Sequence, residues 1–367
     1  GCCIRQYRFV ESSIRPSPPL LPAAGSTGRT RNYRENYFRR MRFRAIMRFR
    51  TTRVILGTVL NPVLVVVLRN LRKWALKTEQ ENINGDYWRK ARLLLRLFYP
   101  NGGPILKITD LEDCFNLMIN LGELEGRNAY FGTKVESEEM SLVKLLVESG
   151  DTFFDVGANI GLYTLVASRL TGETGSVHAF EPASRTSAIL HENLNLNSVT
   201  NVVTNRLAVN ERSCEVEIYV NRESGLTSMG KTGRGSVMAI EKVPSISLDE
   251  YGESQGVRDI HFLKIDVEGF EGHVLRGGKS LLQRSRNITV ICELSRKNFE
   301  PLGFSVSATI AWMNELGFVS WGFDHETRRL VPQDEAVKSS RIQNFVFTRP
   351  TSKSFSVVSS LSDSGVF

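Results

Sequence analysis

The sequence is poor in cysteine and histidine, and this scarcity excludes two kinds of structural site. Its five cysteines include no C-x-x-C pair, and its five histidines include no H-x-x-x-H pair. Structural zinc sites use such ligand pairs, and disulfide-stapled domains carry many closely spaced cysteines. We therefore expect neither a zinc centre nor a disulfide framework.

A long apolar run is also missing. The longest candidate, residues 54–68, has 15 residues and contains Pro62. A membrane-spanning helix needs roughly 20 apolar residues. Because Arg53 and Arg69 flank this run, it could lie on a membrane surface, act as a weak signal anchor, or pack as an ordinary helix. We assign residues 54–77 as an apolar segment with basic flanks, and a cytoplasmic and a membrane-associated location both stay open.

Basic charge is absent from most of the chain, although the net charge is +8. Residues 1–53 hold 13 Arg, no Lys and two acids, so the remaining residues carry a net charge of −3. A nucleic-acid-binding catalytic domain would carry its basic charge on the folded part, and we expect no nucleic-acid partner. Residues 1–53 are predicted to be a disordered basic leader, with an organellar transit peptide as the alternative. Residues 351–367 contain seven serines and are predicted to be a disordered tail.

Residues 151–182 organise the chain. Residues 152–156 form a short apolar run that contains Asp155 and is typical of a strand buried on both faces. Glycines at 157 and 161 bracket a turn, apolar residues at helical spacing follow, and a second strand ends at Glu181. In a doubly wound sheet, ligands bind where strands end and helices begin. Glu181 is therefore placed to accept hydrogen bonds from ribose hydroxyls.

The turn lacks the second and third glycines of a dinucleotide-binding loop. Its sequence is Gly157-Ala158-Asn159-Ile160-Gly161, and a pyrophosphate would also be repelled by Asp155. This argues against an NAD-dependent oxidoreductase. The pattern is similar to the S-adenosylmethionine site of Rossmann-like methyltransferases, and we expect that cofactor. The predicted cofactor-binding residues are Asp155, Gly157, Ala158, Asn159, Gly161, Glu181 and Ala208.

A second motif spans residues 261–271, HFLKIDVEGFE. Lys264 and Asp266 share one face of a strand because side chains alternate, and charges in an apolar strand are costly unless they pair or bind a ligand. Glu268 and Glu271 add two acids at the same end of the strand. Neighbouring negative charges raise the pKa of a carboxyl group, which suits it to remove a hydroxyl proton. We predict Asp266 as the base, Glu268 as second candidate, and Lys264 as the residue that orients Asp266. A structural Lys–Asp pair and a divalent cation held by Asp266, Glu268 and Glu293 are the alternatives; we assign no metal.

Taken together, the segments FFDVGANIGLYTLVAS, HAFEP, SISLDEY and FLKIDVEGFEGHVLRGG resemble the FkbM family of S-adenosylmethionine-dependent methyltransferases over about residues 136–348. The resemblance implies that the first motif binds the methyl donor and that Glu181 binds its ribose. It also implies that the K-I-D-V-E-G-x-E block, with Lys264, Asp266, Glu268, Gly269 and Glu271, is the family signature.

The expected fold is α/β, a Rossmann-like class I methyltransferase with a doubly wound, mostly parallel, seven-stranded sheet and an antiparallel final hairpin. We place the methyltransferase domain at residues 131–350 and an accessory helical segment at 78–130, with one helix near 87–98. The seven predicted strands lie at residues 152–156, 176–180, 200–209, 260–266, 288–294, 318–323 and 344–348. Residues 224–235 are predicted to form a polar loop that covers the site.

The resemblance implies O-methylation of a sugar, glycolipid or polyketide hydroxyl. The expected partner is therefore a small-molecule, glycan or lipid-linked acceptor. An N-P-P-Y-like turn, common among enzymes that methylate nitrogen, is absent after residue 265, which also favours oxygen. A catalytically inactive donor-binding fold that acts as a membrane-tethered interaction protein is the alternative. The sequence indicates no oligomeric state.

Overall fold

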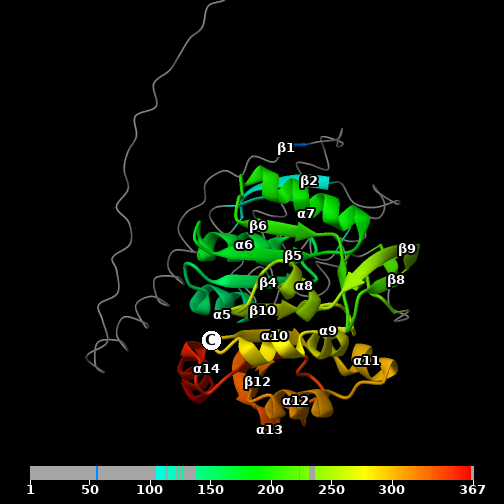
Figure 1. Ribbon diagram of the computed structural model, residues 1–367. Coiled ribbons are helices and arrows are strands. Elements are labelled where there is room, and N and C mark those ends of the chain that lie inside the picture. Colours follow the sequence, from blue (N-terminus) through cyan, green and yellow to red (C-terminus); the bar gives the residue numbers. More distant parts are fainter. Residues whose placement is uncertain are drawn as a thin grey trace, which may run out of the picture. The chain divides into compact units, whose positions relative to one another are not determined.

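The computed structural model describes residues 55–56, 105–111, 115–120, 123, 126, 138–222, 224–230 and 236–364 (Figure 1). The basic leader, the apolar segment beyond Leu56 and the helix predicted near residues 87–98 lie outside the described residues. Within the described part of the chain, no helix is both long enough and apolar enough to cross a membrane.

The centre of the fold is an eight-stranded sheet of order β13-β12-β14-β11-β10-β4-β5-β6. Five strands run parallel: β4 (Thr152–Val156), β5 (Ser176–Phe180), β6 (Val202–Asn205), β10 (Phe262–Ile265) and β11 (Thr289–Glu293). The other three are antiparallel to their neighbours: β12 (Val319–Asp324), β13 (Arg329–Pro332) and β14 (Asn344–Thr348). The doubly wound, mostly parallel sheet with antiparallel final strands is thus confirmed.

The number of strands is eight, and the prediction of seven missed β13. Only Leu330 and Val331 of this four-residue strand are buried, and polar or charged residues stand on both sides of it. A strand that buries two side chains leaves too short an apolar pattern to detect in the sequence.

Helices cover both faces of the sheet. On one face, the core includes residues of α5 (Glu138–Leu146), α6 (Leu162–Thr171), α7 (Ser184–Leu196) and α14 (Lys353–Ser364). On the other face, it includes residues of α8 (Leu248–Ser254), α9 (Glu271–Gly277), α10 (Lys279–Arg284) and α12 (Val306–Glu315). Phe153 and Phe154 of β4 enter opposite cores and are both fully buried, because successive side chains of a strand point to opposite faces.

The third predicted strand divides between two sheets. Residues 202–205 form β6 in the main sheet, whereas Ala208–Val209 form β7 in a separate sheet of order β7-β9-β8. In this smaller sheet β8 (Cys214–Asn221) and β9 (Val237–Ile246) pair antiparallel. The chain thus leaves the main sheet after β6 to form this antiparallel pair.

The accessory segment contains strands where a helical segment was predicted. β2 (Ile105–Leu111) pairs antiparallel with β3 (Phe115–Asn120) and with the two-residue β1 (Ile55–Leu56). Phe115, Leu117 and Ile119 alternate into the core, which gives β3 its period of two. The backbone amide of Met118 donates to Asn193 Oδ1 of α7 at 2.6 Å, which fixes β3 against this helix.

The prediction of a disordered tail is wrong for residues 353–364, which form α14. Phe355, Val358 and Leu361 recur at helical spacing, and Val358 is fully buried. The serines find partners in the fold: Ser362 Oγ donates to the carbonyl of Leu330 at 3.2 Å. Serine content alone therefore misled the prediction, because buried hydroxyls are acceptable once they are hydrogen-bonded.

Candidate active site

A cavity of about 290 Å³ opens at the carboxyl ends of the parallel strands. It lies where β4, β5 and β10 end, as expected for a doubly wound sheet. Eight of the ten predicted site residues line this cavity: Gly157, Ala158, Asn159, Glu181, Ala208, Lys264, Asp266 and Glu268. Asp155 and Gly161 are not among the lining residues.

The loop after β4 is fixed by backbone contacts. The amides of Gly157 and Ala158 both donate to the carbonyl of Phe180 at 3.0 Å. Gly157 has a φ of +81°, and a Cβ there would lie 1.8 Å from the carbonyl oxygen of Asp266. Glycine is thus required at 157 by the close approach of the residue after β10. A larger residue would displace the strand ends as well as any ligand.

Gly161 has a packing role rather than a place in the cavity wall. Its φ is +93°, and a Cβ would lie 2.5 Å from Leu190 Cδ1 of α7. The second glycine of the motif therefore lets α7 pack closely against the start of α6.

Glu181 lies at the end of β5 and is 7% exposed. Its two carboxylate oxygens accept hydrogen bonds from the backbone amides of Asn159 and Ala183, each at 3.0 Å. Burial raises the pKa of Glu181 to about 7, although these two amides favour the ionised form. Its carboxylate links the glycine loop to the start of α7 and faces the cavity.

Asp155 is fully buried beneath the cavity. Its Oδ2 accepts from Thr164 Oγ1 at 2.6 Å, and its Oδ1 lies 3.7 Å from Lys264 Nζ. Burial raises the pKa of Asp155, and Lys264 opposes this effect. Asp155 does not line the cavity, and its carboxylate contacts Thr164 and Lys264 instead. The sequence placed it correctly before the loop but could not give the direction of its side chain.

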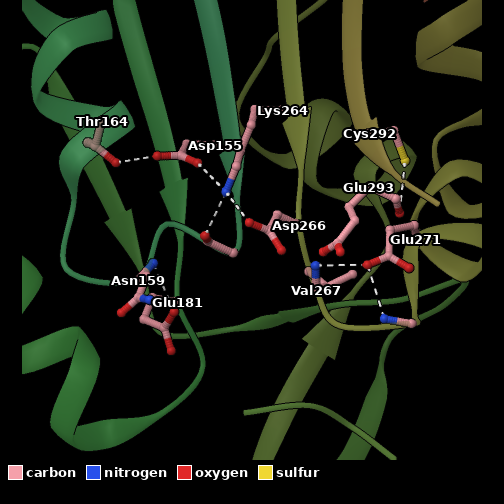
Figure 2. Close-up of polar contacts among 12 residues, drawn as sticks. Asp155, Asn159, Thr164, Glu181, Lys264, Asp266, Val267, Glu271, Cys292 and Glu293 are labelled. Atoms are coloured by element: carbon pink, nitrogen blue, oxygen red, sulfur yellow. Dashed lines mark hydrogen bonds and ion pairs between the residues drawn. The ribbon is translucent and has the colours of Figure 1, made fainter. Parts of the chain in front are cut away.

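Lys264 joins the two motifs (Figure 2). Its Nζ donates to the carbonyl of Gly157 at 3.1 Å and lies 3.4 Å from Asp266 Oδ2, while its side chain is 8% exposed. Burial alone would lower the pKa of Lys264, but Asp266 and Asp155 raise it above its ordinary value, so the amine stays charged. The predicted Lys264–Asp266 pairing is present, and Asp155 is a second partner that the sequence did not indicate.

Three carboxylates meet at the mouth of the cavity. Ligand oxygens of Asp266, Glu268 and Glu293 all lie within 4.8 Å of one another. Asn298 Nδ2 donates to Glu268 Oε2 at 2.8 Å, and Glu268 has a φ of +56°. Burial raises the pKa of Glu293 to about 9, and the charges of Asp266 and Glu268 add to the effect. Such a group could exchange a proton or, when ionised, hold a divalent cation.

Glu271 belongs to the turn rather than to the cavity. Its Oε1 accepts from the backbone amides of Val267 and Gly269, each at 3.0 Å, and the residue is 1% exposed. Burial raises its pKa to about 8, against the effect of these amides. Figure 2 shows Glu271 on the far side of Val267 from Lys264. This acid therefore shapes the V-E-G turn that carries Glu268.

Two lining groups were missed by sequence reasoning. The ring of Tyr163 lies 5.2 Å from Lys264 Nζ, a cation–π contact at the start of α6. Residues Ser224, Gly225, Thr227, Ser228 and Met229 line another part of the wall. The sequence indicated a covering loop at residues 224–235 but not which of its residues face the site.

Comparison with known proteins agrees with this geometry. The model of the methyltransferase FkbM domain matches residues 155–320. These residues are therefore similar to FkbM methyltransferase domains. The family model thus matches the same family that the motifs predicted. β3 and Glu123, which contact the domain, lie before the matched residues.

Two curated proteins that are similar to this chain carry methyltransferase names. The hexuronic acid methyltransferase AglP of Haloferax volcanii is 31% identical over 156 residues, which are 42% of this chain and 61% of AglP. Methyltransferase 1 of Beauveria bassiana is 27% identical over 146 residues, 35% of this chain and 58% of the relative. The matches thus span about three fifths of each relative.

Solved structures with a similar fold are distant. An rRNA-methylase from Clostridium thermocellum, described as putative in its own name, has a TM-score of 0.38 at 11% identity and covers 59% of this chain and 95% of its own. A SAM-dependent O-methyltransferase from Thermotoga maritima has a TM-score of 0.32 at 15% identity and covers 58% of this chain and 64% of its own. The assignment of the fold here rests on the strand order and on the family match.

Proposed function

We propose that the protein transfers a methyl group from S-adenosylmethionine to a hydroxyl oxygen of a sugar or related polyhydroxylated acceptor. The observation that carries this proposal is the position of Asp266. Its carboxylate lines the cavity, its side chain is 46% exposed, and Lys264 Nζ holds it at 3.4 Å. A base needs this combination of access to the acceptor and a fixed direction.

The cavity wall suits the donor. The Glu181 carboxylate would accept hydrogen bonds from the ribose hydroxyls, and the apolar wall of Phe180, Leu207 and Ala208 would pack against adenine. The backbone of residues 157–160 would approach the remainder of the donor. Asp155 acts one step away, because it keeps Lys264 charged and in place.

The protein would contribute mainly position and proton transfer. When bound, S-adenosylmethionine supplies an electrophilic methyl group, which the acceptor oxygen must approach in line with the departing sulfur. Asp266 takes the hydroxyl proton, and Lys264 holds the carboxylate toward the cavity. Holding the reactants at about 3 Å in the correct orientation accounts for much of the catalysis by such sites. Glu268 is the alternative to Asp266 as the base.

A sugar acceptor is the preferred class for two reasons. AglP is named as a hexuronic acid methyltransferase, and the carboxylates of Asp266 and Glu268 can accept several hydroxyl hydrogen bonds. The presence of Glu181, Lys264 and Asp266 around one cavity argues against the alternative of an inactive interaction protein.

The test is a methyl-transfer assay with isotopically labelled S-adenosylmethionine and a panel of glycosides, glycolipids and matched amines. The proposal predicts label on a hydroxyl oxygen, located by mass spectrometry and chemical shift. Transfer to amines but not to hydroxyls would refute the choice of oxygen. Binding of the donor without transfer to any acceptor would favour the inactive reading.

A further inference from the structure

Residues 224–230 form a compact strap, and five of them line the cavity. A short 3-10 turn, η1 (Ser224–Leu226), begins it, and the amide of Thr227 donates to the carbonyl of Ser224 at 3.0 Å. Asn221 Nδ2 donates to the carbonyl of Leu226 at 2.6 Å, and the amide of Tyr219 donates to the carbonyl of Ser228 at 2.8 Å. The strap is therefore tied to the end of β8 along its length.

The two ends of the strap rest on different parts of the site. At its far end, a Cβ on Gly230 would lie 2.9 Å from the ring of Phe270 and 3.3 Å from Leu302, so this end packs beside the turn that carries Glu268. At its near end, the amide of Ser224 donates to Glu123 Oε2 at 3.2 Å. Glu123 also accepts from Arg185 Nη2 at 3.2 Å, and Arg185 follows Glu181 closely in the chain. Glu123 therefore links Ser224 to the first turn of α7, the helix that follows Glu181.

Glu123 is built into this position. Its Oε1 accepts from Asn120 Nδ2 at 2.7 Å, its own amide donates to the carbonyl of Asn120 at 3.0 Å, and its side chain is 9% exposed. One carboxylate therefore joins the end of β3, the first turn of α7 and the strap. Hydrogen bonds to an ionised acceptor are stronger than neutral ones, and this acid comes from outside the residues matched by the FkbM domain.

Ser224 has a polar atom with no role in the protein itself. Its hydroxyl is buried and has no hydrogen-bond partner among the described residues, although the residue lines the cavity. By contrast, Ser228 in the same strap donates from Oγ to the carbonyl of Gly230 at 2.6 Å. A buried hydroxyl without a partner is unfavourable, which indicates that a bound molecule completes its hydrogen bonds.

We propose that the Ser224 hydroxyl binds the methyl donor on its ribose side, and that Glu123 of the accessory segment is the positioning residue that holds Ser224 there. This inference rests on the proposed use of S-adenosylmethionine. It extends the donor site beyond the FkbM domain, to a carboxylate that no motif of that domain contains.

The experiment is calorimetric titration of the full chain with S-adenosylmethionine. Loss of one neutral hydrogen bond predicts that Ser224→Ala raises the Kd about 2- to 10-fold. Glu123→Gln, which keeps size but cannot accept all three hydrogen bonds as the carboxylate does, should raise the Kd by a similar factor. Ser213→Ala is the matched control, because Ser213 Oγ donates to the exposed Glu250 at 2.8 Å and is not among the cavity-lining residues.

A double variant separates positioning from a general structural effect. If Glu123 acts through Ser224, the Kd of Ser224→Ala/Glu123→Gln equals that of the weaker-binding single variant. If the losses of donor affinity in the two single variants add in the double variant, Glu123 does not act through Ser224. If Ser224→Ala binds the donor like the parent, the inference as a whole is refuted, and this result does not depend on whether Glu123→Gln folds. A parent chain that does not bind the donor would instead refute the proposed function beneath both.

Discussion

The substitution Asp266→Asn separates catalysis from structure at this site. Asparagine has the size of aspartate but no basicity, so a base at this position is lost while the shape of the cavity is kept. If Asp266 removes the acceptor proton, the rate should fall by about 10²- to 10⁴-fold, the usual contribution of general-base catalysis. Donor affinity should change little, because the expected donor contacts lie at Glu181 and the glycine loop.

The structure also sets the expected cost in stability. The Asp266 side chain is 46% exposed, so its ion pair with Lys264 is screened by solvent and worth about 1 kcal/mol or less. Lys264 keeps Asp155 at 3.7 Å and the carbonyl of Gly157 at 3.1 Å. Asp155→Asn is the matched contrast. Asp155 is fully buried, and removing one partner of a buried pair costs about 3–5 kcal/mol.

The assay combines urea unfolding with steady-state methyl transfer on the same preparations. The double variant Lys264→Met/Asp266→Asn is the decisive addition. A catalytic Asp266 predicts a double variant that folds and binds the donor but still lacks turnover. The buried Asp155, whose pKa burial raises, would become protonated once its lysine partner is gone, and so would not be left as an unpaired charge. Recovery of activity in the double variant would refute the base assignment, since it would reveal Asp266 as only the ion-pair partner of Lys264.

Three further predictions follow from the same geometry. Donor affinity should rise as the pH increases through about 7, the pKa that burial gives Glu181, because only the ionised carboxylate accepts hydrogen bonds from both ribose hydroxyls. In calorimetry, Glu181→Gln should bind the donor more weakly and without this pH dependence. The free energy of unfolding should fall as the pH rises from about 5 to 8, because the pKa of Glu271 is about 8 in the folded chain and 4.5 in the unfolded chain. In this range the folded state holds a proton that the unfolded state has released. In urea unfolding, Glu271→Gln should reduce the slope of stability against pH by up to about 1.4 kcal/mol per pH unit. Deletion of residues 1–53 should leave the donor Kd within about twofold, because every described residue that lines the cavity comes after Arg53, and a large loss of affinity would give the leader a part in the site.

The central part of the fold could be predicted because its strands are buried on both faces. β4 and β10 are short apolar runs that each contain one charged residue, and these charges meet in the structure as Asp155 and Lys264. The acids at the strand ends were placed by topology, since parallel strands end at one edge of the sheet. Position along the chain was thus enough to gather Glu181, Asp266 and Glu268 around one cavity.

The direction of each side chain could not be predicted in the same way. Asp155 was expected at the donor but points beneath the loop to Thr164, and Glu271 points into its own turn. Both orientations depend on backbone amides and hydroxyls whose positions exist only in the folded chain. β3 and α14 were missed for a related reason. The alternation of apolar residues in β3 and the helical spacing in α14 are each too short to stand out in the sequence. Contacts made only in the folded chain stabilise them, with α7 for β3 and with Trp321 for α14.

The central claim is that the cavity binds S-adenosylmethionine rather than a dinucleotide, and calorimetric titration of the full chain with both ligands tests it most directly. The account predicts saturable binding of S-adenosylmethionine at one site per chain, weakened in Glu181→Ala by about 1.5–3 kcal/mol for each lost charge-assisted hydrogen bond, and no binding of NAD. Binding of NAD, or equal affinity of the parent and Glu181→Ala for S-adenosylmethionine, would contradict it.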